Sequence, residues 1–178
     1  MEIRTIPLDE VPQVLADASA ALQIATWPEA AEASGDEPPA YAIKRPGALA
    51  FFALDAKGQL LGYAEIFPRT IFTEEGSMDI WGLGSVCVTK ASQGQGIGRK
   101  VVEACFQEVD RKQGVSLFQT GVPGFYQKLN CEEVDNSFVN KLDEQHPESN
   151  PFWDDHIMIY PKGYAWPKGQ IDLNGKGY

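Results

Sequence analysis

The first part of the sequence changes from a strand-like to a helix-like spacing of apolar residues. Residues 3–7 predict a short strand, and the apolar side chains between Val11 and Leu22 recur three or four positions apart, which predicts a helix directly after it. The polar segment 35–39 breaks this pattern and contains two prolines, which lack the backbone N–H that helices and sheets use. We therefore predict a surface loop there.

Two apolar, aromatic-rich segments then flank a short polar stretch. They cover residues 48–54 and 60–67, and Gly58 between them suits the positive φ that a hairpin turn often requires. This pattern predicts an antiparallel hairpin. A polar connection at residues 73–77 leads to a further predicted strand at residues 79–88.

Two glycines, Gly82 and Gly84, lie inside the predicted 79–88 strand. Glycine weakens a strand and commonly marks a bulge or the close approach of another backbone or a ligand. The two residues therefore indicate either a strand that bulges beside a ligand or a simple relief of crowding.

The second half of the chain continues with alternating elements. Apolar residues from Ile97 to Val109 share one helical face, and residues 115–122 predict a strand. Pro123 is well placed to start a short helix. Residues 134–141 and 156–160 predict closing strands.

Length and composition indicate one globular domain that covers residues 1–178. The chain is 43% hydrophobic and 22% charged, which is too apolar for a disordered protein. No apolar run approaches the roughly 20 residues that a membrane-spanning helix needs, and the N-terminus has no signal-peptide core. We therefore predict a cytoplasmic protein without a membrane partner.

A net charge of -10 opposes nucleic-acid binding, because phosphate contacts need clustered Lys and Arg. The same charge would attract a cationic small molecule. The alternative is that the charge only keeps the protein soluble. Cys87, Cys105 and Cys131 lack metal-ligand spacing, and His146 and His156 are too far apart for a helix-borne metal motif. The sequence therefore predicts neither a metal site nor a disulfide.

A glycine-rich segment at residues 93–98 lies between a predicted strand and a predicted helix. A helix N-terminus presents unpaired backbone N–H groups, and glycines before it let a phosphate approach without a Cβ in the way. Arg99 stands where a dinucleotide fingerprint needs its third glycine, and no Gly-Lys-Ser or Gly-Lys-Thr follows as in a P-loop. The alternative is that the glycines only permit a tight turn.

The pattern Gln93-x-x-Gly96-x-Gly98, after a strand that ends at Val88, resembles the pyrophosphate loop of the GCN5-related N-acetyltransferase (GNAT) superfamily. The resemblance extends from Ile80 to Asn140, because Phe125-Tyr126-Gln127-Lys128-Leu129 follows in the family's order. It implies an α/β (α+β) fold in which helices flank a mixed central β-sheet. Two parallel strands of that sheet, here residues 80–88 and 115–122, would splay apart.

The resemblance also implies acetyl-CoA as the cosubstrate. Its pantetheine arm would enter between the splayed strands and bond the backbone of Val86 and Val88, and the amides of residues 93–98 would hold the pyrophosphate. The cofactor-binding residues implied in this way are Val86, Cys87, Val88, Gln93, Gly94, Gln95, Gly96, Ile97, Gly98, Arg99, Phe125 and Lys128.

Tyr126 matches the family position whose phenol lies near the cofactor sulfur. We hypothesise that it protonates the departing thiolate, a general-acid role that suits a group with a pKa near 10. The alternative is that Tyr126 packs in the core beside Phe125. Cys87 is a further candidate as an acetylated nucleophile, but no histidine is near it in sequence, and a buried strand cysteine is usually a small hydrophobe.

Many relatives place the base that deprotonates the acceptor amine, a carboxylate, at positions that here fall within residues 82–85. This sequence has no acid there. Glu65 and Asp79 are the nearest acids by sequence, and Glu65 is favoured because residues 63–66 alternate polar and apolar. Both acids are also typical of solvated strand positions. A third option is that no base is needed, because an amine of low pKa arrives partly neutral.

Residues 151–178 form an aromatic extension beyond the family core. We expect it to pack on the domain, to line the acceptor site or to form a contact between two copies of the chain. The last alternative would make the protein a homodimer.

The function predicted is transfer of an acetyl group from acetyl-CoA to an amine of a small molecule, by direct attack in a ternary complex. Acetylation of a protein amine is one alternative. The other is a non-catalytic acyl-CoA-binding or sensing module, which the missing strand carboxylate motivates.

Overall fold

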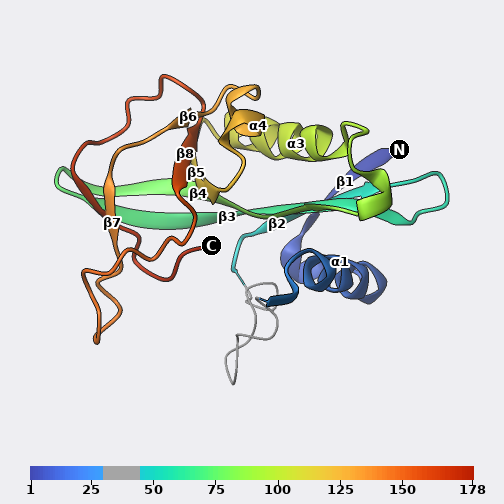
Figure 1. Cartoon of the computed structure of the whole chain (residues 1–178), viewed down its shortest axis with the longest axis horizontal. Helices are drawn as coiled ribbons and strands as arrows, with labels where there is room; N and C mark the ends of the chain where they lie inside the picture. Colours follow the sequence, from blue (N-terminus) through green and yellow to red (C-terminus); the bar gives the residue numbers. More distant parts are fainter. Residues whose placement is uncertain (30–44) are drawn as a thin grey trace. The chain divides into compact units, whose positions relative to one another are not determined.

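The computed structural model describes residues 1–29 and 45–178 (Figure 1), which form two compact units. The first unit comprises residues 1–29, 45–67 and 83–107, and the second comprises residues 68–82 and 108–178. Strands β3 (Leu60–Thr73) and β4 (Gly76–Val88) contribute residues to both units. The loop predicted at residues 35–39 lies outside the described residues.

The first unit is built around an antiparallel arrangement of β1, β2 and β3. The bounds of the first two strands are Glu2–Pro7 for β1 and Leu49–Leu54 for β2. The unit also contains the 3-10 turns η1 (Leu8–Glu10) and η3 (Lys90–Ser92), the helix α1 (Gln13–Thr26) and most of α3 (Ile97–Arg111). Pairing of β2 with β3 runs from Leu49↔Ile66 to Leu54↔Leu60, and Gly58 in the turn has a φ of 79°. The predicted first strand, helix and hairpin are confirmed.

Helices cover both faces of the strands in this unit. Figure 1 shows α1 and α3 on opposite sides of β2 and β3. On one side Leu15 and Leu22 of α1 belong to a cluster with Phe52, Tyr63 and Cys87. Because both faces are covered, β2 is an uninterrupted apolar run whose last five residues are all buried.

The second unit contains the parallel strand pair. Its other elements are β5 (Ser116–Thr120), α4 (Pro123–Gln127), β6 (Glu132–Glu133), β7 (Ser137–Val139), β8 (His156–Tyr160) and β9 (Gln170–Asp172). The start of β4 pairs with β5 in parallel, β5 pairs with β8 antiparallel, and β8 pairs with β6 antiparallel. The parallel ladder consists of Trp81↔Ser116 and Gly82↔Leu117 alone. A mixed α/β fold whose central sheet includes a parallel strand pair is thereby confirmed.

The chain after β6 differs from the prediction in its details. The strand predicted at residues 134–141 shortens to β7, which pairs in parallel with β9, and β9 pairs with β3 at Phe72↔Asp172. No strand was predicted at β9, because Gln-Ile-Asp is too short to show an alternating pattern and depends on its partners. Asn130, three residues after the end of α4, has a left-handed φ of 63°, a conformation that asparagine tolerates.

Helices α1, α3 and α4, the described ones, are all too short or too polar to cross a membrane.

The aromatic residues after Pro151 pack within the second unit. The Tyr178 hydroxyl donates to the Leu117 carbonyl (2.9 Å), and the Gln119 side-chain amide donates to the Tyr178 carbonyl (2.7 Å). The Tyr178 ring also contacts Phe152, with centroids 5.6 Å apart. These bonds tie the segment to β5.

We expect Tyr178→Phe to lower the free energy of unfolding by about 1 kcal/mol, because it removes a hydrogen bond from a buried carbonyl while the ring stays in place. Urea denaturation measures the change. Tyr164→Phe is the matched control, since no partner of its hydroxyl is found in residues 1–29 and 45–178, and it should cost less than about 0.5 kcal/mol. Equal effects of the two changes would contradict the anchoring role of Tyr178.

Candidate active site

The glycine loop before α3 is open on its outer side. Gly94 and Gly96 both have a φ of 75°, and a Cβ built on either would meet no described atom within 4 Å. Residues 93–96 are exposed, and α3 begins at Ile97 and continues for 15 residues. The unpaired amides and the positive dipole end of this helix are therefore accessible to an anion.

The side chains of the loop hold it against the preceding strand and turn. Gln93 donates to the Val88 carbonyl (3.2 Å), and Gln95 donates to the Ala91 carbonyl (3.2 Å). Ile97 is buried, and its Cγ2 lies 3.1 Å from where a Cβ on Gly62 would be. The start of α3 is thus packed closely on β3.

Two positive charges follow the loop. Arg99 forms an exposed ion pair with Glu103 (2.7 Å), and Lys100 is exposed on the next position of the helix. An exposed i,i+4 pair contributes little free energy, so Arg99 can change partners when an anion is present.

The strand before the loop has a left-handed residue that the sequence did not indicate. Ser85 has a φ of 56°, whereas neither Gly82 nor Gly84 has a positive φ. The irregular backbone of β4 therefore lies one residue after Gly84. A Cβ on Gly84 would be 3.7 Å from Oε1 of Glu65, so the Glu65 carboxylate lies beside this irregular backbone.

Glu65 is a buried acid on β3, with only 3% of its surface exposed. Its carboxylate is paired with the Arg45 guanidinium and accepts a hydrogen bond from the Tyr63 hydroxyl (3.2 Å). Arg45 also lies over the Phe67 ring, 4.4 Å from its centroid. Burial raises the pKa of Glu65, and the opposing influences of Arg45 and Tyr63, which lower the pKa, offset only part of this effect. A carboxylate of this kind takes up a proton more readily than a solvated one.

Asp79, the other predicted acid, has a different environment. It lies in the second unit, is exposed, and accepts a hydrogen bond from the Thr70 hydroxyl (2.6 Å). Asp79 is therefore a solvated strand residue, the alternative that the sequence left open for both acids. The structure brings Glu65 next to Gly84 of β4, beside the left-handed Ser85.

Tyr126 lies on α4 in the second unit and is 6% exposed. Its ring contacts Phe118 (centroids 4.6 Å apart) and Phe125 (4.9 Å, edge to face). Phe125 is half-buried and Lys128 is exposed. The packing that the sequence offered as an alternative role is present, and it holds the ring of Tyr126 in a defined orientation.

Cys87 does not have the ionisation of a nucleophile. It is buried on β4, and burial raises the pKa of its thiol to about 12. At neutral pH this thiol stays protonated, so it serves as a small apolar residue. Within the described ranges there is also no group of three or more potential metal ligands.

Two partners of Glu65 were missed by the sequence analysis. Tyr63 had a signal, since residues 63 and 65 share one face of a strand. Arg45 had none, because its pairing with Glu65 joins residues 20 positions apart that only the fold brings together.

The fold is of the mixed α/β class, and its sheet with a parallel strand pair is combined with an open glycine loop before a helix. Residues 47–130 match the family described as "Acetyltransferase (GNAT) domain". The chain therefore contains a domain of the GNAT acetyltransferase family. No curated protein matches the sequence.

Several solved structures share the fold. A GNAT-family N-acetyltransferase from Escherichia coli, in complex with CoA, has a TM-score of 0.62 at 16% identity, over 97% of this chain and 89% of the other. An aminoglycoside 6'-N-acetyltransferase complexed with coenzyme A has a TM-score of 0.59 at 19% identity, over 89% and 96%. The aminoglycoside 6'-N-acetyltransferase from Enterococcus faecium has a TM-score of 0.59 at 21% identity, over 89% and 96%.

Proposed function

We propose that the protein transfers the acetyl group of acetyl-CoA to an amine of a small molecule by direct attack in a ternary complex. The observation that carries this proposal is the open glycine loop at the start of α3, within the segment that matches the GNAT domain. Two of the similar structures contain coenzyme A.

The loop has the properties that a bound diphosphate requires. Its glycines leave space where side chains would stand, and its residues 93–96 are exposed at the positive end of a helix of 15 residues. In our proposal the amides of residues 93–98 hold the pyrophosphate, with Arg99 as a charge partner, and the backbone of Val86 and Val88 bonds the pantetheine arm. Phe125 and Lys128 are the further contacts proposed from the family motif.

Acetyl-CoA supplies a thioester, which is an activated acyl group. Glu65 accepts the proton that the acceptor ammonium must lose before its nitrogen can attack, directly or through a water molecule. As the new C–N bond forms and the C–S bond breaks, Tyr126 donates a proton to the leaving thiolate. Both side chains are buried, so bulk water does not compete with them for the transferred protons.

A cationic amine suits this protein as an acceptor. The chain carries a net charge of -10, which raises the local concentration of cations. Glu65, the proposed base, already pairs with one cation, the Arg45 guanidinium. Two similar structures are named as acetyltransferases of aminoglycosides, which are polyamines. On these grounds we rank a small amine above an amine of a protein.

The pairing of Glu65 with Arg45 supports a second function, a non-catalytic acyl-CoA sensor, because a carboxylate held in an ion pair is less able to accept a proton. Acetyl transfer across a panel of amines distinguishes the two functions. Product formed with any amine supports the enzyme, and cofactor binding without any transfer supports the sensor.

The loop itself is tested by Gly96→Asp and its neutral isostere Gly96→Asn. Both residues tolerate positive φ better than other side chains, so the backbone is kept, but only aspartate places a negative charge beside the diphosphate. We expect Gly96→Asp to bind coenzyme A about 10- to 100-fold more weakly than Gly96→Asn. Calorimetry with coenzyme A measures the difference, and equal affinities would contradict the proposed pyrophosphate site.

A further inference from the structure

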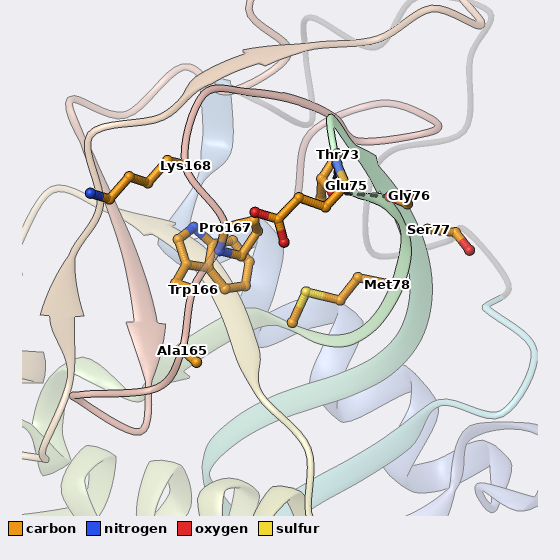
Figure 2. Close-up of a pocket in the computed structure, with 9 residues that line it drawn as sticks. All are labelled: Thr73, Glu75, Gly76, Ser77, Met78, Ala165, Trp166, Pro167 and Lys168. Carbon is orange, nitrogen blue, oxygen red and sulfur yellow. Dashed lines mark hydrogen bonds between the residues drawn. The ribbon is translucent and has the colours of Figure 1, made fainter.

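A separate cavity lies within the second unit, between the turn that joins β3 to β4 and the segment 165–168. It has a volume of about 540 Å³ and is lined, among others, by Glu75, Met78 and Trp166. Figure 2 shows the side chains of Glu75 and Met78 directed toward the Trp166 indole, whereas Lys168 and Ser77 point away. The cavity thus combines a carboxylate, an aromatic face and a thioether.

The aromatic wall is held in place through Asn136. The Trp166 indole N–H donates to the Asn136 side-chain oxygen (2.7 Å), and the Asn136 amide donates to the carbonyls of Pro167 (3.0 Å) and Gly169 (2.9 Å). Because the only polar atom of the indole is already bonded, the ring offers a ligand its π-face and edges. The wall needs little ordering when a ligand binds.

The opposite wall is fixed by a tight turn. The Thr73 hydroxyl donates to the Gly76 carbonyl (3.0 Å) and accepts a hydrogen bond from the Glu75 backbone N–H (3.1 Å). The Glu75 carboxylate has no hydrogen bond or ion pair with any residue of 1–29 or 45–178. A negative charge therefore faces the indole without a protein cation between them.

We propose that this cavity binds a small organic cation, with the ammonium group between the Glu75 carboxylate and the Trp166 ring. A cation is attracted by the face of an indole and by a carboxylate at once, and the polarizable Met78 thioether contacts the carbon substituents of the ammonium. None of the three residues takes part in the proposed acetyl transfer. The site therefore adds a binding function to the chain that does not depend on the glycine loop.

The test compares choline with 3,3-dimethylbutan-1-ol, which has the same shape without the charge. The indole N–H resonance of Trp166, identified by its loss in Trp166→Phe, reports on the cavity in ¹⁵N-labelled protein. We expect choline to shift this resonance in a saturable way and to bind at least about threefold more tightly than the alcohol. Glu75→Gln should weaken choline binding about threefold, as expected for an exposed charge pair.

Ser77→Ala is the matched control, since Ser77 lies at the start of β4, beside the same turn, but points away from the indole, and it should leave the affinity for choline unchanged. The proposal is overturned if choline does not shift the Trp166 resonance, if the alcohol binds equally well, or if Glu75→Gln has no effect. The titrations contain no coenzyme A, and Gly96→Asp protein should bind choline normally. A failure here is thus distinct from a failure of the proposed transferase function.

Discussion

Glu65→Gln is expected to lower kcat for acetyl transfer by about 100- to 10,000-fold, the contribution of a positioned general base. The substitution keeps the shape of the side chain and its ability to accept from Tyr63, but it removes the site that takes up the proton. Steady-state kinetics with a saturating amine measures the loss. Affinity for coenzyme A, measured by calorimetry, should stay within about twofold, which also shows that the protein still folds without the charge opposite Arg45.

The pH profile gives this prediction a second readout. Glu65 must be ionised to act as a base, and burial raises the pKa of its carboxyl above the ordinary 4.5. The rate should therefore rise with pH through an acid limb whose midpoint lies above 4.5, and this limb should disappear in Glu65→Gln. A profile whose acid limb is the same in both proteins would assign the limb to another group.

Asp79→Asn is the control for Glu65, because Asp79 was the other acid that the sequence nominated. Its carboxylate is exposed and bonded to Thr70, so we expect kcat to change by less than about twofold. A large loss in Asp79→Asn together with a small one in Glu65→Gln would reverse the assignment. Small losses in both would favour an amine that reaches the site already neutral.

Tyr126→Phe is expected to reduce kcat by about 100-fold while the affinity for coenzyme A changes by less than about twofold. The ring contacts with Phe118 and Phe125 survive the change, so the effect reports on the hydroxyl and not on packing. Loss of a general acid slows the departure of the thiolate, a step that occurs only after both substrates are bound. The loss should accordingly fall on kcat, with KM for acetyl-CoA little affected.

Tyr160→Phe is the matched control for Tyr126. The Tyr160 hydroxyl donates to Asp110 (2.8 Å) in the same unit, and its loss should leave kcat within about twofold of the native value. Unchanged turnover in Tyr126→Phe would remove the general-acid assignment and leave the packing role. Weaker coenzyme A binding in Tyr126→Phe would show that the residue shapes the cofactor site instead.

The sequence by itself determined the elements whose signals are local. A strand, an amphipathic helix and a hairpin are set by the local spacing of apolar residues, and β1, α1, β2 and the first part of β3 lie where that spacing predicts them. β3 continues to Thr73, six residues beyond the predicted strand. The open loop before α3 is equally local, because glycines at 94 and 96 are required by the positive φ of those positions. The start of the short helix at Pro123 followed from the same kind of signal.

Only the tertiary structure decided which acid is buried. Glu65 and Asp79 both lie on strands, yet the first is enclosed with Arg45 and Tyr63 and the second faces water. The left-handed residue of β4 is Ser85, although the sequence pointed to its glycine neighbours. Likewise β9 exists because β3 and β7 pair with it, and Trp166 faces Glu75 because residues about 90 positions apart meet there. Burial and pairing depend on contacts between distant segments, and such contacts leave no periodic trace along the chain.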